Sequence, residues 1–232
     1  MTYVMSDLHG CYDKFIQMLK IIDFKDNDEL YILGDVFDRG NKPIDILDYI
    51  ISHKNIYLIK GNHEDMFCDY YMNGDYNWIM YNGGDTTLRQ IQEYQMKVSF
   101  NYIENLYKYI KKLPLYKVIE VNNRKFILVH AGLEFYSINI NKNTTVEHFL
   151  EQQNENTLLW DRDNIMFQEV FKDYTTISVH TPTINIRHIL GMSSSNRILF
   201  GKGNIYIDCG CCFEVGTLGC LRLDDMKEFY ID

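Results

Sequence analysis

The chain has 232 residues, of which 46% are hydrophobic and 24% are charged, and its net charge at pH 7 is -9. This hydrophobic fraction excludes an intrinsically disordered chain, and the length fits one domain carrying a sizeable insertion. The acidic balance argues against binding to a nucleic-acid backbone, which needs clustered lysine and arginine.

No apolar run approaches the roughly 18 residues of a membrane-spanning helix, so no membrane association is expected. The chain starts without a basic segment followed by an apolar one, which favours a cytoplasmic protein over a secreted one. Cysteines are reduced in that compartment. Three of the six cysteines cluster at Cys209, Cys211 and Cys212. A second pair with zinc-site spacing is absent from the sequence, so structural thiols are favoured over a structural zinc site.

The first third of the chain alternates between strand and helix signals. Short apolar runs predict three strands, at residues 3–5, 30–33 and 56–59. Apolar residues at helical spacing predict a helix over 11–22, and a second helix should begin near Asn41 as its N-cap, with Pro43 in the first turn. Strands that are apolar on both faces and separated by helices predict an α/β arrangement with parallel pairing.

The pattern changes after the third strand. Residues 64–113 lose strand signals and predict a mostly helical insertion, within a single domain that spans residues 1–232. Later strands are predicted at residues 117–121, 125–129, 175–179, 197–200 and 205–208. Asn122 and Asn123 predict a hairpin between the first two of these, and a last hairpin should turn at Asp224 and Asp225.

Polar side chains follow five of the predicted strands, at the point where each strand ends. They are Asp7 and His9, Asp35, Asn62, His130 and His180. Ligands of open α/β sheets bind where the carboxyl ends of strands converge, so these side chains should meet. Side chains alternate with period two along an extended chain, so Asp7 and His9 should face one ion.

Three imidazoles, two carboxylates and one amide suit Mn²⁺, Zn²⁺ or iron better than a thiolate site or an all-oxygen calcium site. Each residue alone has an ordinary explanation, because Asp7 and His9 could form a strand-end turn and a single histidine is more often part of a core. The five groups together favour a metal centre. Asp35 could bridge two ions, and two ions about 3.5–4 Å apart can deprotonate a shared water molecule for attack on phosphorus.

Five motifs carry a resemblance to a known family. They read SDLHG, GDVFDRG, GNHE, VHAG and VHTP. This set resembles the calcineurin-like metallophosphoesterases, and in particular the small bacterial and phage lambda-type members of the phosphoprotein phosphatase (PPP) branch. Three further segments are also similar to those enzymes: NWIMYNGG (77–84), LLWDR (158–162) and NIYIDCG (204–210). The resemblance implies a β-sandwich of mixed sheets flanked by helices, with the metals at one edge.

The resemblance also implies roles for individual residues. One ion would be held by Asp7, His9 and Asp35, and the other by Asp35, Asn62, His130 and His180. His63 would be the general acid, oriented by Asp38. Arg39 and Arg162, together with Asn62, would bind the phosphoryl oxygens. Two divalent ions are implied, with manganese favoured and iron, zinc or nickel as alternatives, because such ligands accept several divalent ions.

These roles agree with elementary chemistry. An alkoxide is a poor leaving group, so a positioned acid is worth roughly 10²–10⁴-fold in rate. A guanidinium presents a fork that matches two phosphoryl oxygens. Arg162 has an alternative reading as the solvated neighbour of a core Trp160. The sequence departs from the family at Val179, where glycine is usual before the last metal histidine, and at Ser6, where glycine is common.

The favoured function is a metal-dependent phosphomonoesterase that acts on phosphoserine or phosphothreonine in proteins or peptides. Small phosphate esters could be further substrates. The alternatives are a symmetrical bis(5'-nucleosyl)-tetraphosphatase acting on dinucleoside polyphosphates and a non-catalytic metal-binding regulatory module. Tetraphosphatases often lack the aspartate seen here as Asp38 and often carry Asp in place of Glu64, which favours the protein phosphatase. Substrate choice should depend on loops, chiefly 64–113 and 133–157.

Overall fold

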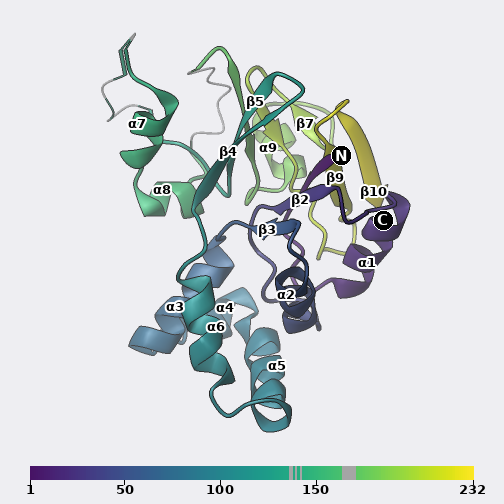
Figure 1. Cartoon of the computed structure of the whole chain (residues 1–232), viewed down its shortest axis with the longest axis vertical. Helices are drawn as coiled ribbons and strands as arrows, with labels where there is room; N and C mark the ends of the chain where they lie inside the picture. Colours follow the sequence, from purple (N-terminus) through teal and green to yellow (C-terminus); the bar gives the residue numbers. More distant parts are fainter. Residues whose placement is uncertain (136–137, 139, 142, 164–170) are drawn as a thin grey trace.

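The structure is a computed structural model that describes residues 1–135, 138, 140–141, 143–163 and 171–232 (Figure 1). Two five-stranded mixed sheets form its centre. The first sheet has the spatial order β10 (Lys227–Ile231), β9 (Leu218–Arg222), β1 (Thr2–Met5), β2 (Glu29–Ile32), β3 (Ile56–Leu58). The second has the order β4 (Tyr116–Val121), β5 (Arg124–Val129), β6 (Tyr174–Ser178), β8 (Asn204–Tyr206), β7 (Leu199–Phe200).

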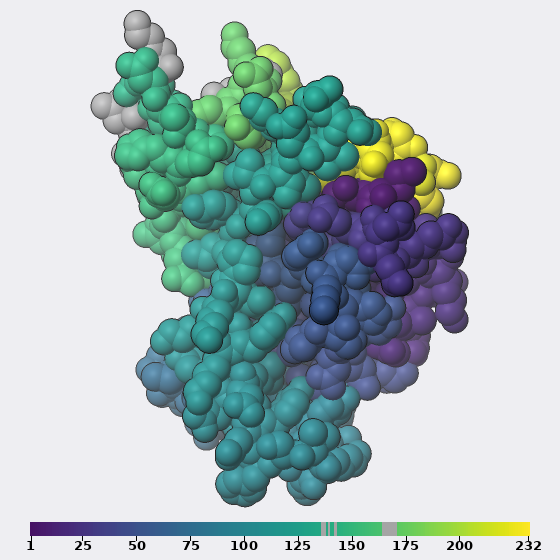
Figure 2. All heavy atoms as spheres, viewed as in Figure 1, coloured from purple at the N-terminus to yellow at the C-terminus, as the bar shows by residue number. Residues whose placement is uncertain are grey.

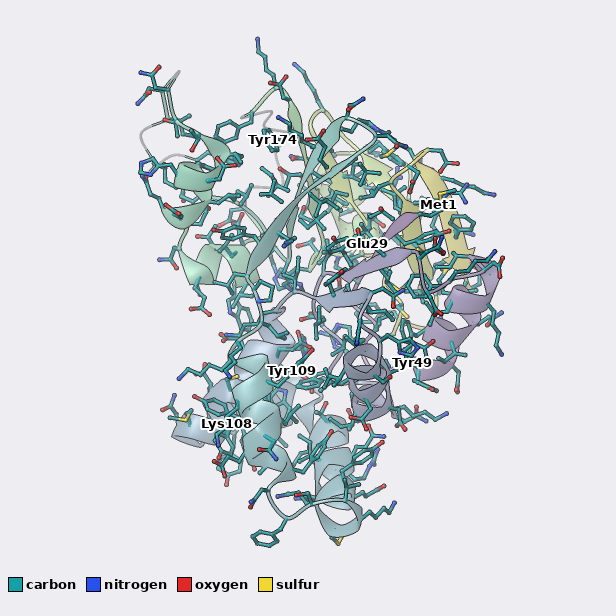
Figure 3. All side chains as sticks on the ribbon, viewed as in Figure 1. Met1, Glu29, Tyr49, Lys108, Tyr109 and Tyr174 are labelled. Atoms are coloured by element: carbon teal, nitrogen blue, oxygen red, sulfur yellow. The ribbon has the colours of Figure 1, made fainter. Side chains whose placement is uncertain are left out.

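The pairing of the strands confirms the predicted α/β class with mixed sheets. Strands β1, β2 and β3 are parallel, as are β5, β6 and β8, while β9 and β10 add antiparallel strands beside β1. The Met1 carbonyl accepts the Glu29 N–H at 2.8 Å where β1 and β2 begin, and Figure 3 labels both residues at this edge. Within each sheet, the parallel strands therefore end at a common edge.

Nine helices are found among the described residues. They are α1 (Tyr12–Ile21), α2 (Pro43–Ser52), α3 (Asn62–Asn73), α4 (Asn77–Asn82), α5 (Gly84–Lys97), α6 (Tyr102–Ile110), α7 (Val146–Glu151), α8 (Glu155–Trp160) and α9 (Thr183–Ile189). The predicted cap of α2 was wrong by one residue, because Lys42 precedes the helix and makes no side-chain cap hydrogen bond. Pro43 begins the helix because the first helical position needs no N–H donor.

The two sheets pack face to face over an apolar core. Val4 and Leu33 on one side meet Leu128, Ile177 and Val179 on the other, all nearly fully buried. Val179, which replaces the glycine usual in the family, therefore contributes its side chain to the core between the sheets. Its effect is on local packing.

Helices cover the outer faces of both sheets. Helices α1 and α2 contribute Phe15 and Leu47 to the core on the outside of the first sheet, while α7 and α8 contribute Phe149 and Leu158 on the outside of the second. Helices α3–α6 lie below the sheets in Figure 1 and make up the lower part of the surface in Figure 2, continuous with the rest of the molecule. Figure 3 labels Lys108 and Tyr109 on α6 in this lower part. Among the helices described, none is long and apolar enough to cross a membrane.

Candidate metal centre and phosphate pocket

A pocket of about 160 Å³ lies where the parallel strands of both sheets end. Its walls include most of the predicted site residues: Asp7, His9, Asp35, Arg39, Asn62, His63, Arg162 and His180. His130 lies directly behind the wall, with its Nε2 2.9 Å from the Asn62 Oδ1. Asp38 lies behind His63. The structure thus brings together all ten residues that the sequence placed at one site.

The backbone after β1 does not continue as an extended chain. Asp7 and His9 have φ values of 47° and 40°, and Asp35 has 54°, which are left-handed conformations that non-glycine residues rarely adopt. Strand alternation was therefore the wrong reason for expecting Asp7 and His9 to face one way, although both side chains do line the same pocket. The turn is held instead by hydrogen bonds between loops, from the His9 N–H to the Asp35 carbonyl at 2.9 Å and from the Gly40 N–H to the His9 carbonyl at 2.9 Å.

Two groups of side chains could each hold a metal ion, and both contain Asp35. In the first group, ligand atoms of His9, Asp35 and His63 lie within 4.8 Å of one another, and in the second those of Asp35, His130 and His180 do. A carboxylate shared by two groups is the arrangement expected of a dinuclear centre. Asp7 belongs to neither group but lines the same pocket.

The donor atoms fit a cation. The Nδ1 of His9 and the Nδ1 of His130 contact the carbonyl oxygens of Phe37 and Leu33 at 2.8 and 2.7 Å, and a protonated Nδ1 leaves each Nε2 as a lone pair. The His130 Nε2 then faces the Asn62 Oδ1, with no hydrogen atom between two acceptors. Among the described residues, the buried atoms Asp7 Oδ2 and His180 Nε2 have no hydrogen-bond partner. A divalent ion would satisfy such converging electron pairs.

Burial sets the protonation of the site. It raises the pKa values of Asp7 and Asp35 well above 3.8, and each is raised further by a neighbouring carboxylate, Asp208 beside Asp7 and Asp7 beside Asp35. Burial lowers the pKa of His130 to about 3 and that of His180 to about 2. The histidines are therefore neutral, as metal ligation requires, and bound cations would reverse the shifts of the carboxyl groups.

A second cluster surrounds His63. Its Nδ1 lies 2.5 Å from the Asp38 Oδ2, and both residues are almost fully buried. The indole N–H of Trp78 donates to the same Oδ2 at 2.6 Å, and the Thr87 hydroxyl donates to Oδ1 at 2.6 Å. Asp38 thus has hydrogen bonds on both carboxylate oxygens, and its partners Trp78 and Thr87 come from the helices below the sheets.

Two arginines face the pocket. Arg39 directs Nη1 to the His9 Nε2 at 2.7 Å and Nη2 to the His63 Nε2 at 3.2 Å. Arg162 donates to the Thr181 hydroxyl at 3.4 Å. Burial lowers the pKa of His63, and the charges of Arg39 and Arg162 lower it further. Both guanidinium groups therefore lie beside the histidines, where an anion of the substrate would neutralise them.

Sequence reasoning assigned no role to several residues that the structure places at the site. Glu64, Trp78 and Thr87 act on the site through hydrogen bonds. Asp208 and Cys212 line the pocket itself. Asp208 follows the strand β8, so the rule that selected the other strand-end residues could also have found it. Part of the 133–157 loop, expected to influence substrate choice, lies outside the described residues.

Comparisons with known proteins agree with this geometry. The family model for the calcineurin-like phosphoesterases matches residues 2–210. A symmetrical bis(5'-nucleosyl)-tetraphosphatase of Wigglesworthia glossinidia brevipalpis is 24% identical over 99% of this chain and 98% of its own length. The enzyme of the same name from Salmonella paratyphi B is 31% identical over 134 residues, which are 57% of this chain and 43% of that enzyme.

Solved structures share the fold. A crystal structure assigned provisionally as a diadenosine tetraphosphatase has a TM-score of 0.62 at 14% identity, over 99% of this chain and 92% of that one. A protein serine/threonine phosphatase from Saccharomyces cerevisiae has a TM-score of 0.59 at 15% identity, over 99% of this chain and 78% of that one.

Together with the family match, the two sheets and the cluster of histidines and carboxylates indicate a metal-dependent phosphoester hydrolase. The chain belongs to the calcineurin-like phosphoesterase family.

Proposed function

We propose that this metallophosphoesterase hydrolyses phosphomonoesters of alcohols, and that phosphoserine or phosphothreonine in proteins and peptides is its substrate. The observation that carries the proposal is the 2.5 Å contact between His63 and Asp38 beside a pocket that two arginines face. A general acid is needed most when the leaving group is an alkoxide. The phosphoanhydride bond of a dinucleoside polyphosphate releases a stable nucleotide anion and needs far less help.

The proposed metal ligands are Asp7, His9, Asp35, Asn62, His130 and His180. When bound, two divalent ions would polarise the phosphoryl oxygens and lower the pKa of a water molecule. Arg39 and Arg162, with the Asn62 amide, would orient the phosphoryl group. Manganese remains the favoured ion, with iron, zinc or nickel as alternatives, because several divalent ions suit these ligands.

His63 is proposed to donate the proton from Nε2 to the ester oxygen as the phosphorus–oxygen bond breaks. The products are an alcohol and inorganic phosphate, and a water molecule supplies the new oxygen on phosphorus. In the absence of substrate, burial and the charges of Arg39 and Arg162 lower the pKa of His63 to about 3. A phosphate dianion would neutralise both arginines, so substrate binding itself favours the imidazolium that acts as the acid.

A symmetrical tetraphosphatase activity is the second candidate. It is supported by the names of the bacterial relatives that align with most or part of this chain. Low identity and the presence of Asp38 weigh against carrying that activity over directly. Both candidates use the same pocket, and they differ in the leaving group.

Two product assays separate the candidates. The purified protein with Mn²⁺ is incubated with phosphoserine and phosphothreonine peptides, with p-nitrophenyl phosphate, and with diadenosine tetraphosphate. Release of phosphate from the peptides supports the proposal. Faster release of ADP from diadenosine tetraphosphate overturns it in favour of the second candidate. His63→Asn should bind metal normally and lose turnover mainly on the alkyl phosphates.

A further inference from the structure

The helices below the sheets hold the carboxylate behind the proposed general acid. Thr87 is completely buried, and its hydroxyl both accepts the Asp38 N–H at 2.8 Å and donates to the Asp38 Oδ1 at 2.6 Å. Trp78, which is 1% exposed, donates its indole N–H to Oδ2 at 2.6 Å. Since the His63 Nδ1 contacts the same Oδ2, three side chains fix one carboxylate.

The backbone between Trp78 and Thr87 allows both side chains to reach Asp38. A side chain on Gly84 would place its Cβ 2.5 Å from the Trp78 ring, so only glycine lets the indole lie against the start of α5. Gly83 has a left-handed φ of 80°, and its carbonyl accepts the Arg39 N–H at 3.2 Å. The segment 77–87 thus contacts both Asp38 and Arg39, the two neighbouring residues of the second motif.

We infer that Trp78 and Thr87 are positioning residues for catalysis, which fix the Asp38 carboxylate so that it directs the His63 Nε2 at the leaving oxygen. This inference rests on the proposed role of His63 as the general acid. Two strong hydrogen bonds leave the carboxylate one orientation, with one lone pair of Oδ2 aimed at the His63 Nδ1. Without them the carboxylate can rotate about its Cβ–Cγ bond, and the imidazole loses its direction.

A purely structural role predicts a different outcome. Burial of two polar side chains requires hydrogen-bond partners in any case, so removing one partner would cost stability regardless of catalysis. Loss of stability alone would leave the ratio of rates on good and poor leaving groups unchanged. The ratio is therefore the quantity to measure.

The test uses the full chain loaded with Mn²⁺ and two substrates. p-Nitrophenyl phosphate has a good leaving group, and a phosphoserine peptide has a poor one. Thr87→Val removes the hydroxyl at nearly constant volume, Thr87→Ser retains it, and Trp78→Phe removes the indole N–H. Thr86→Val is the matched control, because the Thr86 hydroxyl donates to the Gly83 carbonyl at 3.0 Å rather than to Asp38.

We expect Thr87→Val and Trp78→Phe to lower kcat on the peptide by about 10–100-fold and on p-nitrophenyl phosphate several-fold less, as orienting partners of functional histidines typically do. Thr87→Ser keeps the hydroxyl and should retain most of the wild-type kcat on the peptide. Thr86→Val should leave the ratio of the two rates unchanged. Equal losses on both substrates, or no loss, would overturn the inference. If Thr87→Val does not fold, the ratio of the two rates is measured instead for Trp78→Phe and for Thr87→Ser compared with Thr87→Ala.

The same assay separates this inference from the proposed function. His63→Asn should change the ratio in the same direction and by more. If His63→Asn lowers both rates equally, the general-acid role and this inference fail, while the proposed function is decided separately by the release of phosphate from the peptides. If His63→Asn is selective but Thr87→Val and Trp78→Phe are not, only the positioning role fails.

Discussion

The Glu64 carboxylate accepts the backbone N–H of Asp35 at 2.8 Å and so connects the loops of the second and third motifs. It also accepts the N–H groups of Val36 at 2.9 Å, Phe37 at 3.3 Å and Gly61 at 2.9 Å, and it is fully buried. Four backbone donors on one side chain hold the left-handed turn at Asp35 that directs the shared carboxylate into the pocket.

Glu64→Gln should therefore destabilise the fold and weaken the metal centre together. A glutamine amide presents two N–H donors where four N–H groups need acceptors, and an unsatisfied buried network of this kind costs on the order of 2–4 kcal/mol. Urea unfolding of the metal-free protein, followed by circular dichroism, measures the loss. A stability equal to that of the wild type would contradict this account of Glu64. Glu64→Asp tests whether a shorter carboxylate can still accept these N–H groups, and its unfolding free energy should lie between that of Glu64→Gln and that of the wild type.

Asp7→Asn should change metal affinity and metal-free stability in opposite directions. Its Oδ2 is buried without a hydrogen-bond partner among the described residues, and burial raises its pKa. A neutral amide removes this unfavourable charge, so the melting temperature of the chelated protein should rise. It also removes an anionic ligand, so Mn²⁺ affinity should fall by about 10–100-fold. Isothermal titration calorimetry and thermal melts of one preparation give both values. Unchanged Mn²⁺ affinity would exclude the ligand role, and a lower melting temperature of the chelated protein would contradict the account of the buried charge.

Arg39→Met should bind the first metal ion more tightly than the wild type. The guanidinium donates to the His9 Nε2, which is the atom proposed to bind an ion, so arginine and cation compete for one lone pair. Its removal should raise Mn²⁺ affinity a few-fold, while KM for a phosphopeptide rises because a bidentate phosphate contact is lost. Titration calorimetry and steady-state kinetics measure these changes. Weaker metal binding in the variant would show that Arg39 supports the site rather than competing with the ion.

The metal-free protein should lose stability as pH rises from about 7 to 8. Burial raises the pKa of Asp38 to about 7 and those of Asp7 and Asp35 well above 3.8. A carboxyl group with a raised folded-state pKa stabilises the fold at low pH, and this contribution is lost as pH rises through that pKa. The histidines of the site have lowered pKa values and act in the opposite sense, but above about pH 7 they are mostly neutral in the unfolded state as well, because the unfolded pKa is about 6.5. The carboxyl groups therefore dominate this range.

Melting temperatures of the chelated protein across this range check the prediction, and each kcal/mol of unfolding free energy lost corresponds to about 2–4 °C. Cys11 contributes in the opposite direction and stabilises the fold as pH rises, because a hydrogen bond to Cys211 lowers its pKa to about 7. Cys11→Ser provides a background without this contribution. Added Mn²⁺ should flatten the decline, since cations favour the ionised carboxylates. A melting temperature that rises with pH in the chelated Cys11→Ser protein would refute the prediction.

The positions of the site residues could be predicted because each follows a strand that the local sequence marks clearly. Short apolar runs indicated the strands, and the rule that ligands bind where parallel strands end indicated that Asp35, Asn62 and His130 would meet, although His130 follows a strand of the second sheet. The turn geometry at Asp7 could not be predicted in this way, because left-handed residues held by hydrogen bonds from other loops have no periodic signal.

Contacts between distant segments were also out of reach. Thr87 reaches Asp38 across 49 positions and Trp78 reaches it across 40, and no spacing within either segment indicates a partner. Helices α7, α8 and α9 have six or seven residues, which is too short for a 3.6-residue period to repeat clearly. Tertiary packing rather than local pattern decides such elements.

The proposed ligands extend along the chain from Asp7 to His180 and come from both sheets, with the helices α3–α6 between Asn62 and His130. A site assembled from such distant segments can form only after long chain loops have closed, which is slow. We therefore expect the protein to bind its ions late in refolding. In a stopped-flow experiment, the rate at which the refolding protein takes metal ions from an indicator dye would then report when the two sheets have packed together.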